Sequence, residues 1–372
     1  MAAQSQSLTA LKSAIARSRT APGSPQVCPA PSSPTAPRPK FSGLEVEELQ
    51  LCSELDNVAS RQAWVPLRIV RQPEAAALNG PQQQQQQQQP AVILLHATGV
   101  DMSSLAEQQA AFARRGYIAV AMDCRYHGAR SETGAGARDG YQLALIRAWH
   151  GSGERPFLLD NVWDLQRVLD YLQQRPDVDA ARIAVTGISL GGMHSWLLAA
   201  ADDRIAAAAP MIGVQHFGWA VQQLRYHARV ESIPLVFQAA AADMQQAQQQ
   251  QQRPTEVGSN GSSGSGSHEI SSEVVTAVWN RLLPGLLEHY DAPQSLPLIA
   301  PRPLLVANGE LDPRCPMQGV ELAMAAARAA YEQQGAGDKL QLYVVPGCTH
   351  ECTACMWEQV HAFFDRHLLN AA

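Results

Sequence analysis

The chain of 372 residues has no long apolar run, no cluster of basic residues and no regular cysteine framework. Its longest apolar stretch, residues 205–214, is rich in alanine and much shorter than the roughly 18 residues of a membrane span. The formal net charge is −6, without any concentration of Lys and Arg, which argues against a nucleic-acid partner. Seven cysteines are an odd number in a long chain and favour a reducing compartment over a disulfide scaffold.

Acidic side chains are absent from the first 44 residues, although this stretch includes five basic ones. Residues 8–19 have the spacing of a short, basic, amphipathic helix. Leaders that are basic and rich in Ala and Ser are typical of organellar transit peptides. Two interpretations of residues 1–40 stay open. They form either a disordered tail of a cytoplasmic protein, or a transit peptide that directs the protein to a plastid or mitochondrion.

Two internal stretches are of low complexity and are expected to contribute little to a core. Residues 81–90 are a run of glutamines between two prolines, and residues 240–268 are rich in Gln and then in Gly and Ser. We expect both to be low-complexity insertions in surface loops. About 300 residues remain, enough for a single large domain within residues 41–372.

The rest of the chain alternates short apolar runs with amphipathic helical segments. The apolar runs predict buried strands at residues 91–95, 117–122, 183–186, 204–211, 303–308 and 340–345. This alternation predicts an α/β fold, a mostly parallel sheet with helices on both faces. Residues 64–71 predict a further strand in which Pro66 suits an edge position. Residues 213–300 depart from the alternation and predict a helical cap over the carboxyl edge of the sheet. The alternative, that these helices simply pack on the sheet, stays open.

Residues 187–191 read G-I-S-L-G and lie between a predicted strand and a helix-compatible run. This G-x-S-x-G pattern is that of a nucleophile elbow, a sharp turn that lifts a serine hydroxyl above the sheet. A Cβ atom at Gly187 or Gly191 would clash in so tight a turn. Ser189 is therefore the candidate nucleophile. The Leu190 N–H, at the start of the next helix, is a candidate donor to an oxyanion.

Two further side chains complete a candidate catalytic triad. Asp312 and His350 each follow a predicted strand, at the edge where open α/β sheets bind their ligands. A serine hydroxyl is a poor nucleophile, so an imidazole must accept its proton and later return it to the leaving group. A carboxylate must in turn fix the imidazole tautomer. The order Ser189, Asp312, His350 along the chain is that of α/β-hydrolases.

Four stretches of the sequence resemble the α/β-hydrolase superfamily, within about residues 91–234 and 274–369. They are R-I-A-V-T-G-I-S-L-G-G around Ser189, the D-x-R-x-H-G turn that begins at Asp123, N-G-x-x-D-P-R around Asp312 and the G-x-x-H end at His350. Among subgroups, the chain is similar to dienelactone hydrolases, acetyl xylan esterases and prolyl oligopeptidase catalytic domains. It is also similar to a group of plant and green-algal α/β-hydrolases that share G-I-S-L-G-G-M-H.

The resemblance implies an α/β-hydrolase fold and a serine hydrolase that cleaves an ester or related acyl bond through an acyl-enzyme. It implies a small-molecule acyl substrate and no cofactor. By position, the Thr98 N–H is the second expected oxyanion donor, beside that of Leu190. The sequence departs from the family there, because His96 is followed by Ala97 where the family has glycine.

Several alternatives stay open beside this interpretation. Cys348, Cys352 and Cys355 surround His350 at a density typical of a metal site or a redox pair. Metal ligation would remove His350 as a base, so we expect no metal. The fold also suits a prolyl-oligopeptidase-like peptidase or a non-catalytic, ligand-binding scaffold. Other histidines near the predicted strand ends are expected to be structural, namely His96, His127 and His194.

Overall fold

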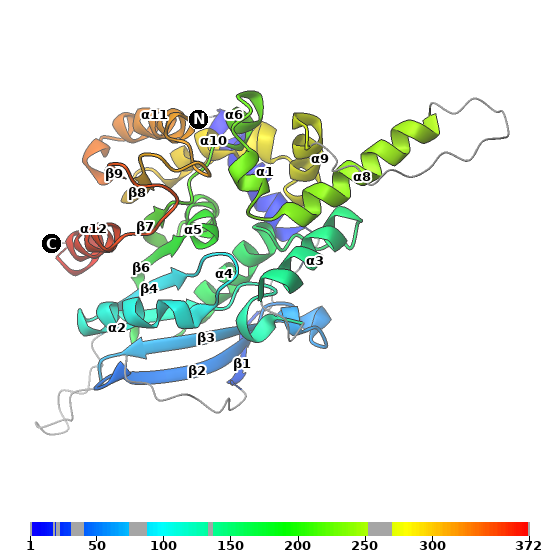
Figure 1. The fold of residues 1–372 in the computed structure, drawn as a ribbon. Coiled ribbons are helices and arrows are strands. Elements are labelled where there is room, and N and C mark those ends of the chain that lie inside the picture. Colours follow the sequence, from blue (N-terminus) through cyan, green and yellow to red (C-terminus); the bar gives the residue numbers. More distant parts are fainter. Residues whose placement is uncertain are drawn as a thin grey trace, which may run out of the picture.

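Strands of the described residues form one sheet with the order β1-β2-β3-β5-β4-β6-β7-β8-β9 (Figure 1). The computed structural model describes residues 2–17, 19, 23–30, 41–73, 88–132, 137–251 and 270–370. The strands are β1 (Gln26–Pro29), β2 (Glu45–Cys52), β3 (Trp64–Arg71), β4 (Gln89–Leu95), β5 (Ile118–Met122), β6 (Val178–Ile188), β7 (Ile205–Met211), β8 (Leu304–Gly309) and β9 (Leu340–Val345).

The strands from β5 to β9 are parallel in the order β5-β4-β6-β7-β8-β9, whereas β1, β2 and β3 extend the sheet with antiparallel pairs. The expectation of a mostly parallel sheet is therefore confirmed. The edge position expected for Pro66 is wrong, because β3 lies between β2 and β5. Pro66 is tolerated there because the pairing of β3 with β5 begins only at Leu67, which pairs with Met122.

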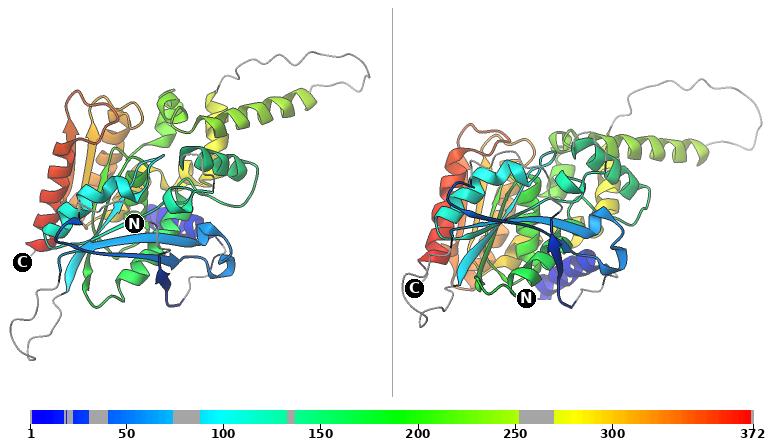
Figure 2. Two further views of the ribbon diagram at one scale, coloured as in Figure 1. Left: turned by 60° about the horizontal axis from the view of Figure 1, so that its bottom comes forward. Right: turned by 90° about the horizontal axis from the view of Figure 1, so that it is seen from below.

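Helices cover both faces of the sheet, and alternate residues of each strand face the two layers. On β4, Val92 and Leu94 pack with α2 (Ala106–Arg114) and α12 (Ala354–Phe364). Ile93 and Leu95 face the other layer. That layer includes α4 (Leu159–Leu172), α5 (Leu190–Ala201) and α11 (Met317–Gln333). Figures 1 and 2 show α12 along one flank and α4 and α5 across the opposite face.

The segment expected to form a cap, residues 213–300, consists in its described part of helices joined by short turns. It contains α6 (Phe217–Gln222), α7 (His227–Val230), α8 (Pro234–Gln251), α9 (Ser272–Leu282), η6 (Leu286–Tyr290), α10 (Ala292–Ser295) and η7 (Leu296–Ile299). Trp279 of α9 joins these helices, because its ring packs against Phe157, Phe217 and Phe237. By contrast, α10 and η7 pack against α11 and belong to the layer on the sheet.

The second low-complexity stretch is partly helical, which the sequence interpretation missed. α8 continues through the glutamines as far as Gln251 and projects away from the body of the protein (Figure 2). Glutamine is a good helix former, so the buried first half of α8 nucleates a helix that propagates into the polar repeat. Residues 252–269 and 81–87 lie outside the described residues.

The disordered tail expected for residues 1–40 is wrong for the residues described there. Residues Ala2–Ala16 form helix α1, and β1 extends the sheet. Leu11 and Ile15, one helical turn apart, are both buried in the core. Composition alone does not predict this packing, because two apolar side chains at the right spacing are enough to dock a polar helix. The transit-peptide interpretation stays a prediction.

An ionic network holds the end of α1 against α4. Asp160 of α4 is fully buried and pairs with Arg19 at 2.6 Å and with Arg17 at 3.1 Å. A buried carboxylate needs such partners, because burial alone would favour its neutral form. Burial does raise the pKa of Asp160, but the charges of Arg125, Arg19 and Arg17 hold it below its usual value.

We expect Leu11→Ala to lower the free energy of unfolding by about 2–5 kcal/mol, because it opens a cavity under α1. Urea unfolding followed by circular dichroism measures the change. The exposed Ser13, on the same helix, provides the control, and Ser13→Ala should change stability by less than about 0.5 kcal/mol. Equal stability of the two variants would show that α1 is not docked in solution.

Among the described residues, no helix combines the length and apolar character needed to cross a membrane.

Candidate active site

The turn between β6 and α5 carries Ser189 in a strained backbone conformation. Ser189 has φ 55° and ψ −105°, a region that residues with a Cβ rarely adopt. A Cβ atom on Gly191 would lie 2.2 Å from the carbonyl oxygen of Leu95, and one on Gly187 would lie 2.6 Å from Gly191. The two glycines therefore allow α5 to begin directly against β4. This is the geometry expected of a nucleophile elbow.

Three predicted site residues lie together at the carboxyl ends of β6, β8 and β9. The Ser189 hydroxyl donates to Nε2 of His350 over 2.8 Å. Nδ1 of His350 donates to Oδ2 of Asp312 over 2.7 Å. Neighbouring strands end at the same edge, so residues far apart in sequence meet there.

The Asp312 carboxylate is held rigidly on its other side. Its Oδ1 accepts the backbone N–H groups of Arg314 at 2.8 Å and Cys315 at 3.0 Å. Asp312 is 2% exposed, so water does not compete for these bonds. The carboxylate therefore fixes His350 in the tautomer whose Nε2 can accept a proton from Ser189.

The electrostatics of the site keep His350 neutral. Burial lowers the pKa of its ring below the ordinary 6.5, the bond to Asp312 opposes this, and nearby arginines lower the pKa further. The His350 side chain is only 9% exposed. The imidazole is thus ready to accept a proton at neutral pH.

The two residues expected to donate to an oxyanion lie at the ends of adjacent strands. Leu190 is the first residue of α5, so its N–H has no partner within the helix. Thr98 lies in the turn after β4, the strand that pairs with β6. Both follow strands that end at the carboxyl edge of the sheet.

The remaining histidines near the site are buried and bonded to the backbone. Nε2 of His96 accepts the Cys124 N–H, so Nδ1 carries the hydrogen and donates to the Ala97 carbonyl at 2.8 Å. His127 contacts the Arg125 carbonyl, and burial lowers its pKa to about 3. His194 contacts the Phe157 carbonyl, and burial lowers its pKa to about 4. These contacts hold loops in place, as expected of structural histidines.

The cysteines around His350 do not converge on it within the described residues. Cys348 lies against the Glu351 carbonyl, Cys352 against Met211, and Cys355 against the Thr353 hydroxyl. All of them are free thiols. Both ring nitrogens of His350 are already engaged by Ser189 and Asp312.

A different set, Asp312, Cys315 and His350, brings its potential ligand atoms within 4.8 Å of one another. The donors do not suit a metal ion. The carboxylate and the imidazole bind each other, and the Cys315 thiol donates to the Ile212 carbonyl. Burial raises the pKa of this thiol well above the ordinary value, so it stays protonated. The arrangement suits proton transfer between hydrogen-bonded groups better than ligation.

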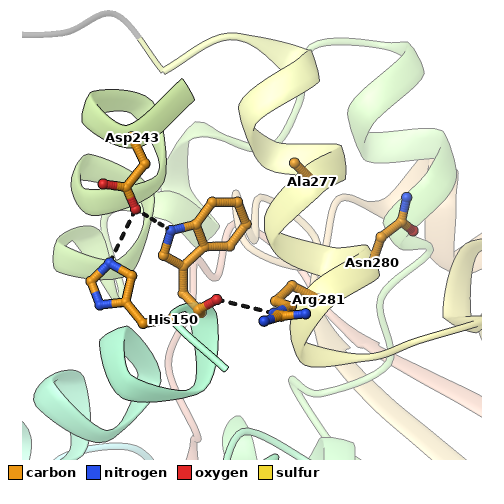
Figure 3. A pocket seen from close by; sticks show the side chains of 6 residues that line it. His150, Asp243, Ala277, Asn280 and Arg281 are labelled. Carbon is orange, nitrogen blue, oxygen red and sulfur yellow. Dashed lines mark hydrogen bonds and ion pairs between the residues drawn. The ribbon is translucent and has the colours of Figure 1, made fainter. Parts of the chain in front are cut away.

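A separate surface hollow of about 530 Å³ lies between the end of α3 (Ala137–Trp149), α8 and α9 (Figure 3). Its charged groups and the Trp149 indole are bonded within the hollow. Asp243 accepts from the Trp149 indole at 2.7 Å and contacts His150 at 3.0 Å, and Arg281 donates to the Trp149 carbonyl. These bonds fasten α8 to the body of the protein.

The sequence interpretation missed the arginines beside the triad. Arg229 of α7 contacts Cys315, and Arg314 follows Asp312 by two residues. The D-P-R motif was visible in the sequence but pointed to no role for its arginine. No sequence pattern indicated that Arg229 lies near the site, because only the fold of the helical segment brings α7 beside the candidate triad.

Known proteins resemble this chain in sequence and in fold. The model of the dienelactone hydrolase family matches residues 75–260, half of the chain, including the elbow at Ser189. The Bacillus subtilis protein YtaP, described as a hydrolase, is 27% identical over 177 residues. That match covers 48% of this chain and 43% of YtaP, less than half the length of the relative.

Solved structures share the fold over nearly the whole chain. Acetyl xylan esterase 1 from Thermoanaerobacterium sp. JW/SL YS485 has a TM-score of 0.57 and 15% identity, covering 97% of this chain and 92% of its own. The glucuronoyl esterase from Solibacter usitatus has a TM-score of 0.59 and 15% identity, covering 98% and 91%. With its nucleophile-elbow geometry and a match over half its length, the chain belongs to the dienelactone hydrolase family of the α/β-hydrolase superfamily.

Proposed function

We propose that the protein is a serine hydrolase that cleaves ester bonds, with Ser189 as the nucleophile. The observation that carries the proposal is the continuous hydrogen-bonded series from the Ser189 hydroxyl through His350 to Asp312. The strained elbow supports it, because backbone strain of this kind persists where a site requires it.

The reaction proceeds in two halves that use the same side chains. Oγ of Ser189 attacks the ester carbonyl while Nε2 of His350 accepts the hydroxyl proton, and Asp312 stabilises the resulting imidazolium. The tetrahedral intermediate collapses, His350 gives the proton to the departing alcohol, and the acyl group stays on Ser189. Water then attacks the acyl-enzyme with His350 again as the base, which releases the carboxylic acid.

Two N–H groups stabilise the negative charge on the former carbonyl oxygen, those of Leu190 and Thr98. The dipole of α5 favours an anion at the Leu190 N–H. His96 positions the other donor. Its Nδ1–H binds the Ala97 carbonyl, and the Thr98 N–H of the same planar peptide points the opposite way. This bond restrains a loop in which alanine replaces the family's glycine.

Ester rather than peptide substrates are proposed because the fold matches an acetyl xylan esterase and a glucuronoyl esterase over almost their full lengths. The acylaminoacyl peptidase from Pyrococcus horikoshii, in contrast, is matched over only 42% of its chain. More than half of that peptidase chain therefore lies outside its match to this protein.

A fluorophosphonate probe tests the proposal. It should label Ser189 covalently, and mass spectrometry of the digested protein identifies the modified residue. The rate of labelling should rise with pH to a plateau, with a midpoint below pH 6.5. The sign follows from the lowered pKa of His350, since only the neutral imidazole accepts the serine proton. Labelling of another residue, or a midpoint above pH 7.5, would contradict the proposed role of this pair.

A further inference from the structure

Three cysteines flank the candidate general base in the loop between β9 and α12. Residues 348–355 read C-T-H-E-C-T-A-C, and the proposed reaction uses only the histidine. Cys352 and Cys355 lie on either side of the start of α12, because Thr353 caps that helix and its hydroxyl accepts the Met356 N–H at 3.4 Å. A C-x-x-C pair at the start of a helix is an arrangement in which one thiol is activated for redox chemistry.

Cys355 is the thiol of this pair that is suited to react with an oxidant. It is partly exposed and is the second residue of α12, where the helix dipole favours a negative charge. Its Sγ lies 3.0 Å from the Thr353 hydroxyl. Hydrogen bonds from Thr353 and from Tyr343 of β9 lower the pKa of Cys355 below its ordinary value. The thiolate, which is the nucleophilic form of cysteine, is therefore favoured at this position.

Cys352 is a thiol of the opposite kind. It packs against the apolar side chains between α12 and the sheet, with its Sγ 3.8 Å from Sδ of Met211. Burial raises the pKa of Cys352 to about 12, and the charges of Cys348 and Cys355 raise it as well, so the three thiols lie near one another. A protonated thiol beside an activated one is the arrangement of a resolving cysteine, which closes a disulfide after its neighbour has been oxidised.

Other thiols near the candidate triad do not share the activation of Cys355. Cys124 and Cys315 are fully buried, and burial raises the pKa of each well above its ordinary value. Burial and the charge of Glu351 raise the pKa of Cys348. Oxidation at this end of the sheet should therefore begin at Cys355.

Cys352 also connects the pair to the nucleophile. Its neighbour Met211 ends β7, and the Met211 carbonyl accepts the Ser189 N–H at 3.0 Å. Cys352 follows His350 by only two residues. A movement of the Cys352 side chain therefore acts on both partners of the bond between Ser189 and His350.

The part of the loop before His350 is held firmly against β8. The Leu311 N–H donates to the Cys348 carbonyl at 2.8 Å. A Cβ atom on Gly309 would lie 2.3 Å from the Thr349 carbonyl oxygen, so the two backbones are in direct contact there. Because this part cannot shift freely, a displacement of Cys352 must be taken up at His350 itself.

We infer that Cys352 and Cys355 form a redox site, at which a hydroperoxide converts the two thiols to a disulfide and thereby slows hydrolysis at Ser189. This inference rests on the proposed function of Ser189. The two sulfur atoms of a disulfide are about 2 Å apart, so the Cys352 sulfur has to leave Met211 to form the bond. That movement pulls on the loop segment that carries His350.

The oxidation proceeds in two steps that balance. The Cys355 thiolate attacks one oxygen of hydrogen peroxide, the O–O bond breaks, and the released hydroxide takes up a proton as water, which leaves a sulfenic acid on Cys355. The Cys352 sulfur then attacks the Cys355 sulfur, the S–O bond breaks, and hydroxide departs with the Cys352 proton as a second water. The two thiols lose two electrons in total, and the peroxide gains them. A dithiol reductant such as dithiothreitol reverses the reaction.

Peptide mapping shows whether the disulfide forms, and it needs no turnover. The folded protein is treated with hydrogen peroxide, its remaining thiols are blocked, and it is cleaved after glutamate without reduction. Cleavage after Glu351 and Glu358 releases residues 352–358, which separates the pair from Cys348. This peptide should be unblocked and lighter by the two hydrogens lost, and dithiothreitol should restore its original mass.

Turnover of a neutral ester is measured on the same samples. Oxidised wild-type protein should lose about tenfold or more in kcat, since misplacement by about 1 Å can cost on the order of 10² in rate. Dithiothreitol should restore the activity. Cys352→Ser and Cys355→Ser should each have wild-type activity when reduced, and should keep it in peroxide. The matched control Cys348→Ser should lose and regain activity as the wild type does.

Each remaining outcome overturns one of the two proposals. If peroxide leaves the peptide 352–358 unchanged, or forms the disulfide without slowing turnover, the inference is wrong and the proposed function stands. Equal inactivation of the wild type and Cys352→Ser would place the damage at another residue, such as Met211, and would also contradict the inference. A disulfide that forms in a protein without esterase activity would contradict the proposed function and not the reactivity of the pair.

Discussion

Replacing Ser189 by alanine should lower kcat for ester hydrolysis by on the order of 10⁶, the scale found when a triad nucleophile is removed. We expect so large a loss because, among the described residues, Ser189 is the one hydroxyl bonded to His350. Turnover of a neutral ester, measured beside the melting temperature, checks the prediction. The fold should be retained, because Ser189 makes no other side-chain bond among the described residues.

Ser195 provides a matched control for this variant. It lies in α5, the helix that begins directly after Ser189, and is buried. Among the described residues its hydroxyl donates only to the Gly191 carbonyl, at 2.7 Å. Ser195→Ala should change turnover by no more than a few fold. If Ser189→Ala kept wild-type turnover, or if the two variants lost it equally, the nucleophile would have to be another residue.

Asp312→Asn should lower kcat by on the order of 10⁴ without unfolding the protein. The amide oxygen can still accept the N–H groups of Arg314 and Cys315, so the turn after β8 should persist. The amide nitrogen, however, donates to Nδ1 of His350 and forces the hydrogen onto Nε2. That nitrogen can then no longer accept the proton of Ser189.

The same variant distinguishes proton transfer from metal ligation. Triad members act as a unit, so Ser189→Ala combined with Asp312→Asn should be little worse than Ser189→Ala alone. Cys352→Ser and a chelator should have little effect on turnover or melting temperature. Loss of activity with the chelator, together with a mild effect of Asp312→Asn, would instead indicate a metal site that includes His350.

Local sequence patterns were sufficient to predict which candidate residues meet at one edge of the sheet, wherever those residues follow strands. Apolar runs locate the strands because parallel strands are buried on both faces, and the residue after each strand then lies at one known edge. Ser189, Asp312 and His350 are all of this kind. The elbow adds an independent signal, since Gly187 and Gly191 are required by the close approach of β4.

Composition was a weaker guide than spacing. The first 40 residues are too polar to suggest a packed element, yet Leu11 and Ile15 dock a helix and Arg19 neutralises Asp160. The partner of Arg19 lies 141 residues away, and no local pattern predicts such a pair. Local patterns also do not predict that Pro66 lies inside the sheet. Its position there depends on where the pairing of β3 with β5 begins.

By itself the sequence determined the fold class, the elbow and the order of the triad, because each depends on short-range periodicity or on residues next to a strand end. Only the tertiary structure decided that α1 belongs to the core, that the cysteines near His350 point apart, and that Arg229 lies against Cys315. These depend on how distant segments pack, and packing brings together side chains whose sequence separation carries no signal. The position of Arg229 beside the site comes from that packing alone.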